Sequence, residues 1–125
     1  MAAEKNFEDR VKAFLKEQGC YFIKYWGGGR YTRDGVPDLL VCMFGSFVGI
    51  EIKAQHGEPS MLQLKHLDMI RDAGGFGILL YPRDFEKFME WVVDKFRKHK
   101  WYMKNLELQK QWFHKILERV EKDGN

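Results

Sequence analysis

The sequence predicts an α/β fold in which helices flank a central sheet of mixed strand direction. The main indication is a pair of apolar runs within residues 35–54, the first of them at 39–44, that flank a short glycine-containing turn and predict a β-hairpin. Stretches with helical spacing of apolar residues precede and follow this hairpin. A helix between the third and fourth strands implies a right-handed parallel crossover. The expected order of elements is αβββαβ, followed by a helical extension.

The composition is typical of one intracellular domain. The chain has 125 residues, 45% of them hydrophobic, which is enough for one sizeable core. The formal net charge of +3 is a mild basic excess, compatible with a nucleic-acid partner. No apolar run approaches the roughly 20 residues of a membrane span, and the charged first residues predict no signal peptide. Cys20 and Cys42 lack a CxxC spacing, so we expect buried, reduced thiols and a cytoplasmic location.

The first helix is expected over residues 6–18, with Asn6 at its start and Gly19 at its end. Its apolar residues recur at helical spacing and are Phe7, Val11, Phe14 and Leu15. Glu8 lies beside this stripe. It is either a solvated first-turn glutamate favoured by the helix dipole or a carboxylate that leans over the sheet.

A strand over residues 20–26 leads into a glycine-rich loop. Residues 27–29 are three consecutive glycines, which mark a flexible loop, and no phosphate-binding GK[ST] spacing follows them. Arginines beside stackable aromatic rings are what nucleic-acid channels use. The candidate nucleic-acid contacts are therefore Lys24, Arg30, Tyr31 and Arg33. An ordinary solvated loop remains the alternative.

The second half of the chain supplies further helices and one strand. Ser60 and Gln63 form a capping-box pattern at the start of a helix that ends at residues 74–75. A strand over 76–81 follows, then a helix capped by Asp84 and a last helix over 105–122. Residues 1–82 are expected to form the core of a single domain. Residues 83–125 are an extension whose apolar residues pack on this core or against a second subunit.

Three charged residues, Asp38, Glu51 and Lys53, interrupt the apolar hairpin. Charged groups are seldom buried without a partner or a metal, so their positions need a cause. A turn at residues 44–45 sets Asp38 opposite Glu51, whereas a turn at 45–46 sets it opposite Lys53. Both registers place all three residues on one face. A surface ion pair between Lys53 and a carboxylate is the simpler alternative.

These residue types suit phosphodiester hydrolysis. Two carboxylates can hold Mg²⁺ or Mn²⁺, which neutralises developing negative charge and lowers the pKa of a bound water. A lysine beside them can contact the phosphate or orient the water. Clustered carboxylates that repel phosphate argue against the alternative of a non-catalytic nucleic-acid-binding module.

The pattern Pro-Asp38 followed by Glu51-x-Lys53 resembles the PD-(D/E)xK nuclease signature, and αβββαβ is the core order of that restriction-endonuclease-like superfamily. The residues Gly-Val-Pro-Asp-Leu-Leu at 35–40 and Ile-Glu-Ile-Lys-Ala at 50–54, with Gly57, Ser60, Gln63 and Ala-Gly-Gly at 73–75, are similar to the virus-type replication-repair nuclease (VRR-NUC) domain. The resemblance spans roughly residues 6–82.

This resemblance implies a divalent-metal-dependent DNA endonuclease that uses Mg²⁺ or Mn²⁺. By the same resemblance, Asp38 and Glu51 are metal ligands and Lys53 is the catalytic lysine. Glu8 matches the acidic residue of the first helix and is expected as a third metal ligand. Gln63 matches the second-helix glutamine of the family, so a site role and a capping role both remain open. Stand-alone members, often phage-encoded, resemble junction-resolving homodimers, which favours branched or four-way-junction DNA as substrate.

Overall fold

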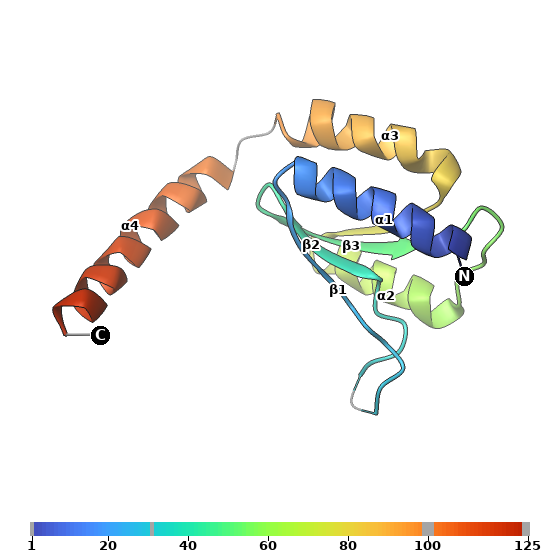
Figure 1. The fold of residues 1–125 in the computed structure, drawn as a ribbon, viewed down its shortest axis with the longest axis horizontal. Helices are drawn as coiled ribbons and strands as arrows, with labels where there is room; N and C mark the ends of the chain where they lie inside the picture. The colour runs from blue at the N-terminus through green and yellow to red at the C-terminus, as the bar shows by residue number, and fades with distance from the viewer. Residues whose placement is uncertain (1, 31, 99–101, 124–125) are drawn as a thin grey trace.

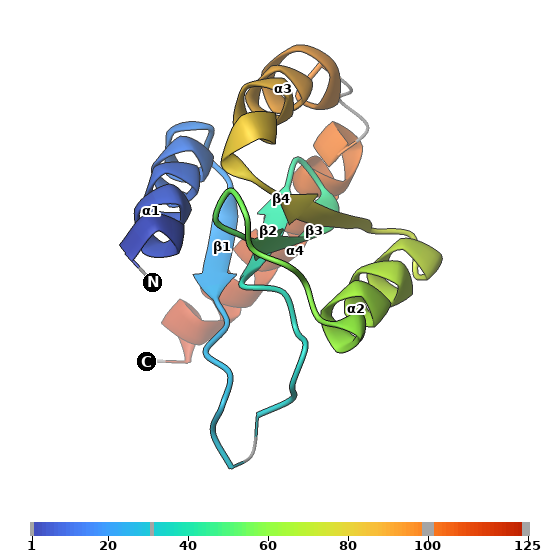
Figure 2. The same ribbon diagram turned by 90° about the vertical axis from the view of Figure 1, so that its right-hand side faces the viewer.

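The computed structural model describes residues 2–30, 32–98 and 102–123. The first six elements follow the expected order and are α1 (Ala2–Glu17), β1 (Tyr21–Lys24), β2 (Leu39–Met43), β3 (Ser46–Ile52), α2 (Met61–Asp72) and β4 (Phe76–Leu80). The strands form one mixed sheet in the order β1-β2-β3-β4, antiparallel except for the parallel pair β3 and β4. Helices α1 and α3 (Phe85–Glu90) lie on one face of this sheet and α2 on the other (Figures 1 and 2). The expected α/β fold with a mixed sheet is confirmed.

The β2–β3 hairpin closes through the two residues Phe44 and Gly45. Both have positive φ angles, 44° and 88°, as a type I′ turn requires. This is the first of the two registers that the sequence allowed. If this register is extended by one residue before the start of β2, Asp38 lies opposite Glu51.

The main core lies between the sheet and the helices α1 and α3. The sheet contributes alternate residues of its two central strands, which are Leu39, Val41, Met43, Val48, Ile50 and Ile52. The predicted apolar stripe of α1 is buried against them. Two of its rings, Phe7 and Phe14, meet Phe85 of α3 edge to face, with centroids 5.4 and 6.1 Å apart. Because alternate strand residues point to opposite faces, the residues between these core positions face α2 or solvent.

Helix α2 covers β4 and β3 and leaves β1 and β2 open on that face. The contact with β4 is close, since a Cβ on Gly77 would lie 2.4 Å from the Leu67 carbonyl oxygen. An unbroken apolar run such as residues 39–44 is typical of a strand covered on both faces, but no helix of the described residues covers the second face of β2. Cys42 is therefore exposed and Cys20 half-buried, so the expectation of two buried thiols is wrong.

The extension after residue 82 begins with helices that pack on the core. A 3₁₀ turn over Pro82–Asp84 leads into α3, which continues as a π-helical stretch over Trp91–Phe96. The side chain of Asp84 makes no capping hydrogen bond, so the expected cap is wrong. The preceding 3₁₀ turn makes a side-chain cap unnecessary, because the Phe85 amide already donates a hydrogen bond to the Pro82 carbonyl.

The last helix, α4 (Tyr102–Lys122), projects away from the rest of the molecule (Figure 1). It contacts the core at its first turn, where the Tyr102 ring lies 5.9 Å from that of Phe44. None of its residues is buried, and its exposed apolar side chains are Met103, Leu106, Leu108, Trp112, Phe113, Leu117 and Val120. Within the described ranges, no helix has the length and apolar character needed to cross a membrane.

Candidate metal-binding hydrolytic site

The charged residues of the hairpin meet at the end of the sheet where β2 begins and β3 ends. Glu51 is 2% exposed, although it carries a carboxylate. Its Oε2 lies 3.2 Å from Nζ of Lys53, while its Oε1 has no hydrogen-bond partner among the described residues. A buried polar atom without a partner is unfavourable by about 1–3 kcal/mol, and native proteins keep such atoms mainly where a ligand or a function requires them.

The Asp38 carboxylate is fixed by the backbone of β3. It precedes β2, and its Oδ2 accepts a hydrogen bond of 2.8 Å from the Ile52 amide. The Asp38 side chain thus supplies a hydrogen-bond acceptor for β3 just before the first residue of β2.

The α1 face supplies a second set of charges. Lys24 is half-buried, with Nζ 2.7 Å from Oε1 of Glu8 and 3.2 Å from Oδ1 of Asp38. Lys12, one helical turn after Glu8, lies 3.0 Å from its Oε2. These residues line a small cleft of about 220 Å³ between α1 and the end of β1, together with Trp26. Lys12 was not singled out from the sequence, although its i, i+4 spacing from Glu8 is a signal that could have indicated it.

The electrostatics separate the two glutamates. Burial, reinforced by the negative charge of Asp38, raises the pKa of Glu51 to about 7, despite the opposing effect of Lys53. Burial also acts to raise the pKa of Glu8, but the hydrogen bonds and charges of Lys24 and Lys12 outweigh it and the net pKa is lowered. The negative charge of Glu8 is thus balanced by its two lysines, whereas that of Glu51 is only partly balanced by Lys53.

A divalent metal fits part of this arrangement. In residues 2–30, 32–98 and 102–123, no three or more His, Cys, Asp or Glu side chains are grouped so as to hold a metal ion. Glu8 is joined to Asp38 through Lys24, not directly. Asp38 and Glu51 nevertheless suit Mg²⁺, which binds through one or two carboxylates and keeps several waters. The Oε1 of Glu51, which has no partner within the described part of the chain, is the observation that favours a cation at this point.

Gln63 forms the predicted capping box. Its side-chain Oε1 accepts a hydrogen bond of 2.8 Å from the backbone amide of Ser60. The Ser60 hydroxyl in turn accepts a hydrogen bond of 3.1 Å from the backbone amide of Gln63. The amide oxygen is therefore engaged at the start of α2. Of the two roles that the sequence left open, this arrangement supports the structural one.

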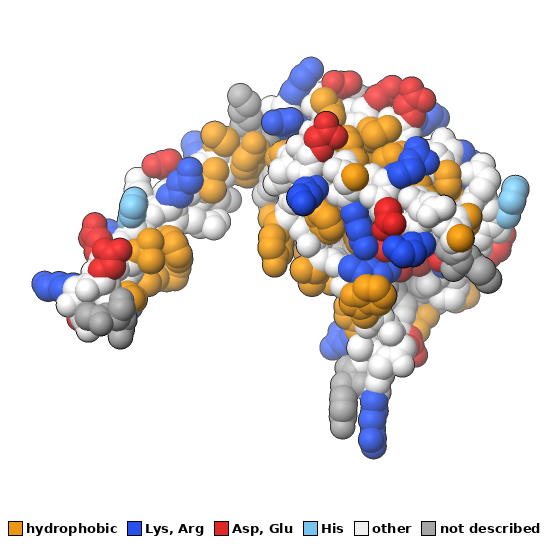
Figure 3. Space-filling model, in the orientation of Figure 1, with side chains coloured by type: hydrophobic (Ala, Val, Ile, Leu, Met, Phe, Trp, Pro, Cys, Tyr) orange, Lys and Arg blue, Asp and Glu red, His pale blue; other side chains and the backbone are white. Residues whose placement is uncertain are grey.

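The glycine-rich loop protrudes from the same end of the sheet (Figures 1 and 2). Arg33 is tied back by its amide, which donates a 2.7 Å hydrogen bond to the Tyr25 hydroxyl. Arg30 is exposed, and Tyr31 lies outside the described residues. Lys24 stands at the base of this loop, with its ammonium 5.4 Å from the centre of the Trp26 ring. Figure 3 shows basic side chains gathered around carboxylates just above the loop.

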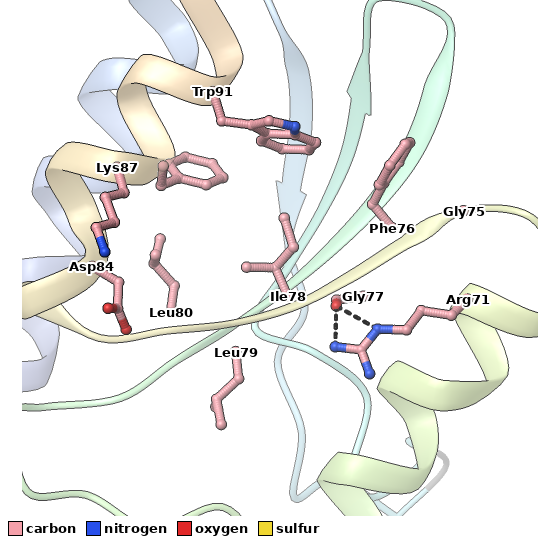
Figure 4. Close-up of a pocket in the computed structure, with 11 residues that line it drawn as sticks. Arg71, Gly75, Phe76, Gly77, Ile78, Leu79, Leu80, Asp84, Lys87 and Trp91 are labelled. Atoms are coloured by element: carbon pink, nitrogen blue, oxygen red, sulfur yellow. Dashed lines mark hydrogen bonds between the residues drawn. The ribbon is translucent and has the colours of Figure 1, made fainter. Parts of the chain in front are cut away.

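A larger apolar groove of about 490 Å³ runs along β4, between α3 and α2 (Figure 4). Its walls include Phe76, Ile78, Leu80 and Trp91. At its other end the Arg71 guanidinium donates two hydrogen bonds, of 3.0 and 2.6 Å, to the Gly77 carbonyl. This groove shares no residue with the carboxylate cleft, and its charged lining residues, Arg71, Asp84 and Lys87, include only one carboxylate, so we do not place the candidate metal site there.

Comparisons with protein-family models, with curated proteins and with solved structures gave no match to this chain. The functional assignment therefore depends on the residues and their geometry.

Proposed function

We propose that this protein is a divalent-metal-dependent DNA endonuclease with a PD-(D/E)xK core formed by residues 1–82. The observation that carries the proposal is the buried Glu51, whose Oε1 has no partner among the residues that the structure describes and whose neighbours are a second carboxylate and a lysine. A purely structural ion pair would be expected to satisfy both oxygens, or to replace the buried charge with an apolar group.

Each residue of the site has a chemical role in this proposal. Asp38 and Glu51 would hold Mg²⁺ or Mn²⁺, which supplies charge neutralisation at the phosphate and a bound water of lowered pKa. The Ile52 amide fixes the Asp38 carboxylate, so this ligand is oriented before binding. Lys53 lies just after β3 with its ammonium against Glu51, where it can contact the scissile phosphate or orient the attacking water.

DNA binding in this proposal uses the loop that protrudes beside the carboxylates. Arg30 and Arg33 can contact backbone phosphates, and the exposed Trp26 ring offers a stacking surface. Branched or four-way-junction DNA is the substrate we favour, by the resemblance to the VRR-NUC domain.

We further propose a homodimer that pairs through α4. Leu106, Phe113 and Val120 are spaced by seven residues and form a continuous exposed line along this helix. In an antiparallel pair, Phe113 would meet its own copy at the two-fold axis, and Leu106 would meet Val120 of the second copy. The stripe is thus complementary to itself, as a two-fold interface requires, and a two-strand cut requires two such active sites.

A cleavage assay tests the proposed activity. Linear, nicked, flap and four-way-junction DNA are incubated with Mg²⁺ or Mn²⁺ and the wild type, Asp38→Asn or Lys53→Met. We expect metal-dependent cleavage by the wild type and a loss of at least about 100-fold in rate in both variants, a size typical of removing a preorganised charge from a hydrolytic site. Lys65→Met, at an exposed lysine of α2, is the matched control and should cut like the wild type.

Two results would contradict the proposal. Wild-type rates in both Asp38→Asn and Lys53→Met would show that the site is misassigned. Salt-dependent DNA binding that is indifferent to EDTA, without cleavage in either metal, would indicate the alternative of a binding module that keeps the nuclease fold.

A further inference from the structure

Lys24 makes contacts that its sequence position did not suggest. The sequence predicted a nucleic-acid contact, yet the ammonium lies between two carboxylates, 2.7 Å from Glu8 and 3.2 Å from Asp38. The first distance is that of a charge-assisted hydrogen bond, and the second is that of a longer ion pair with hydrogen-bond geometry. The lysine side chain is 19% exposed, so water screens these contacts less than it would on an open surface.

We propose that Lys24 competes with the divalent cation for the carboxylates of this site, so that metal binding displaces its ammonium toward the DNA. This inference rests on the proposed metal-dependent function. Asp38 is the shared partner, because it is both a candidate metal ligand and an acceptor of the Lys24 ammonium. Two cations cannot occupy the same lone pairs of one oxygen at contact distance, and their charges repel.

The displaced side chain has a defined place to go. Lys24 ends β1 at the base of the glycine-rich loop, and its ammonium already lies 5.4 Å from the Trp26 ring centre. This ring faces solvent, with 74% of its surface exposed. A short rotation of the lysine stem past it would bring the charge to a bound phosphate. Lys24 is then a positioning residue that couples metal loading to DNA contact.

The test measures Mn²⁺ binding directly, by electron paramagnetic resonance of the free ion, in the absence of DNA. Lys24→Met removes the competing charge and keeps most of the side-chain stem. We expect the Kd of this variant for Mn²⁺ to be about tenfold lower or more, because a tenfold change in Kd corresponds to the free energy of about one charge-assisted hydrogen bond. Lys24→Arg keeps a cation with a bidentate fork and should bind Mn²⁺ no more tightly than the wild type. Lys16→Met is the matched control, because Lys16 is an exposed lysine of the same helix as Glu8 and does not line the carboxylate cleft.

Thermal unfolding of the same variants in EDTA and in Mn²⁺ provides a second readout. Lys24→Met leaves Glu8 and Asp38 without their shared partner, so it should unfold at a lower temperature in EDTA. It should also gain more from Mn²⁺ than the wild type does, because the tighter ligand gives the larger shift.

The outcomes separate the two proposals. Equal or weaker Mn²⁺ affinity in Lys24→Met than in the wild type overturns the competition and leaves the metal site in place. No Mn²⁺ binding by the wild type or by Lys24→Met overturns the proposed metal-dependent function, and the competition with it.

Discussion

Lys53 Nζ lies 3.2 Å from Oε2 of Glu51, yet this contact does not offset the burial of the glutamate. The other oxygen of Glu51 is unpartnered among the described residues, and burial together with Asp38 raises the pKa of Glu51 to about 7. A cation bound by both Glu51 and Asp38 would balance the remaining negative charge. The same imbalance makes the stability of the protein depend on pH.

The free energy of unfolding in EDTA should fall as pH rises through the range between the ordinary glutamate pKa of about 4.5 and the folded-state pKa of about 7. The sign follows because the folded state binds the Glu51 proton more tightly than the unfolded state does, so this stabilisation is complete below pH 4.5 and is lost above pH 7. The contribution is of the order of 3 kcal/mol. Urea unfolding at several pH values from 5 to 8 measures it.

Glu51→Gln should remove most of this pH dependence, because the amide has the same shape and does not titrate. The exposed Glu58→Gln is the control and should keep the wild-type slope. Glu8, with its lowered pKa, acts in the opposite direction and below pH 4.5, outside the range measured. An unchanged slope in Glu51→Gln would contradict the raised pKa of Glu51.

Gln63 should prove a structural residue. Its side chain satisfies the Ser60 amide at the start of α2, so Gln63→Ala should lose about 0.5–1 kcal/mol of stability. Gln63→Glu keeps an oxygen acceptor at this position and should retain both stability and cleavage rate. Chemical unfolding and single-turnover cleavage measure the two effects. A large loss of rate in Gln63→Glu at full stability would instead indicate a role in the site.

Gly77 should not tolerate a side chain. A Cβ at this position would lie 2.4 Å from the Leu67 carbonyl oxygen, so Gly77→Ala must push α2 away from β4. We expect a loss of about 3 kcal/mol or more in the free energy of unfolding. Gly27→Ala is the control, because no atom lies within 4 Å of its Cβ, and it should change stability by less than about 0.5 kcal/mol. Equal stabilities would show that α2 packs less closely than described.

Phe113→Glu should disrupt the proposed dimer without unfolding the protein. The Phe113 side chain is 57% exposed and lies on a helix with no buried residue, so its replacement removes little packing within one chain. Analytical ultracentrifugation should show a dimer for the wild type and a monomer for the variant. Lys115→Glu is about 200° around the helix from Phe113 and serves as the control for added negative charge. A wild type that stays monomeric at high concentration would refute this pairing.

The loop arginines should contribute to DNA affinity through phosphate contacts. Replacing both Arg30 and Arg33 by alanine should weaken binding to all DNA structures and reduce the slope of log affinity against log salt by about 2, close to one per lost contact. Fluorescence anisotropy in EDTA at several salt concentrations measures this. A slope equal to that of the wild type would mean that neither arginine contacts DNA.

The sequence by itself determined the elements and the chemistry-bearing residues. Periodicity located α1 and α2, and a capping box marked the start of α2, because these signals are local and depend on spacing within one helix. The predicted start of α1 at Asn6 is wrong, since this helix begins at Ala2. The hairpin turn limited the register to two choices, and the structure selected the one closed by Phe44 and Gly45. Because both registers place Asp38, Glu51 and Lys53 on one face, the sequence alone groups these three residues.

The tertiary structure decided how charges from distant segments are shared. Lys24 and Glu8 are 16 residues apart, and no local pattern indicates that the lysine bridges Glu8 to Asp38. It also decided which face of β2 is covered, since that depends on where α2 packs against the neighbouring strands. Burial and charge pairing arise from contacts between elements, so they are not encoded in the spacing within any one of them.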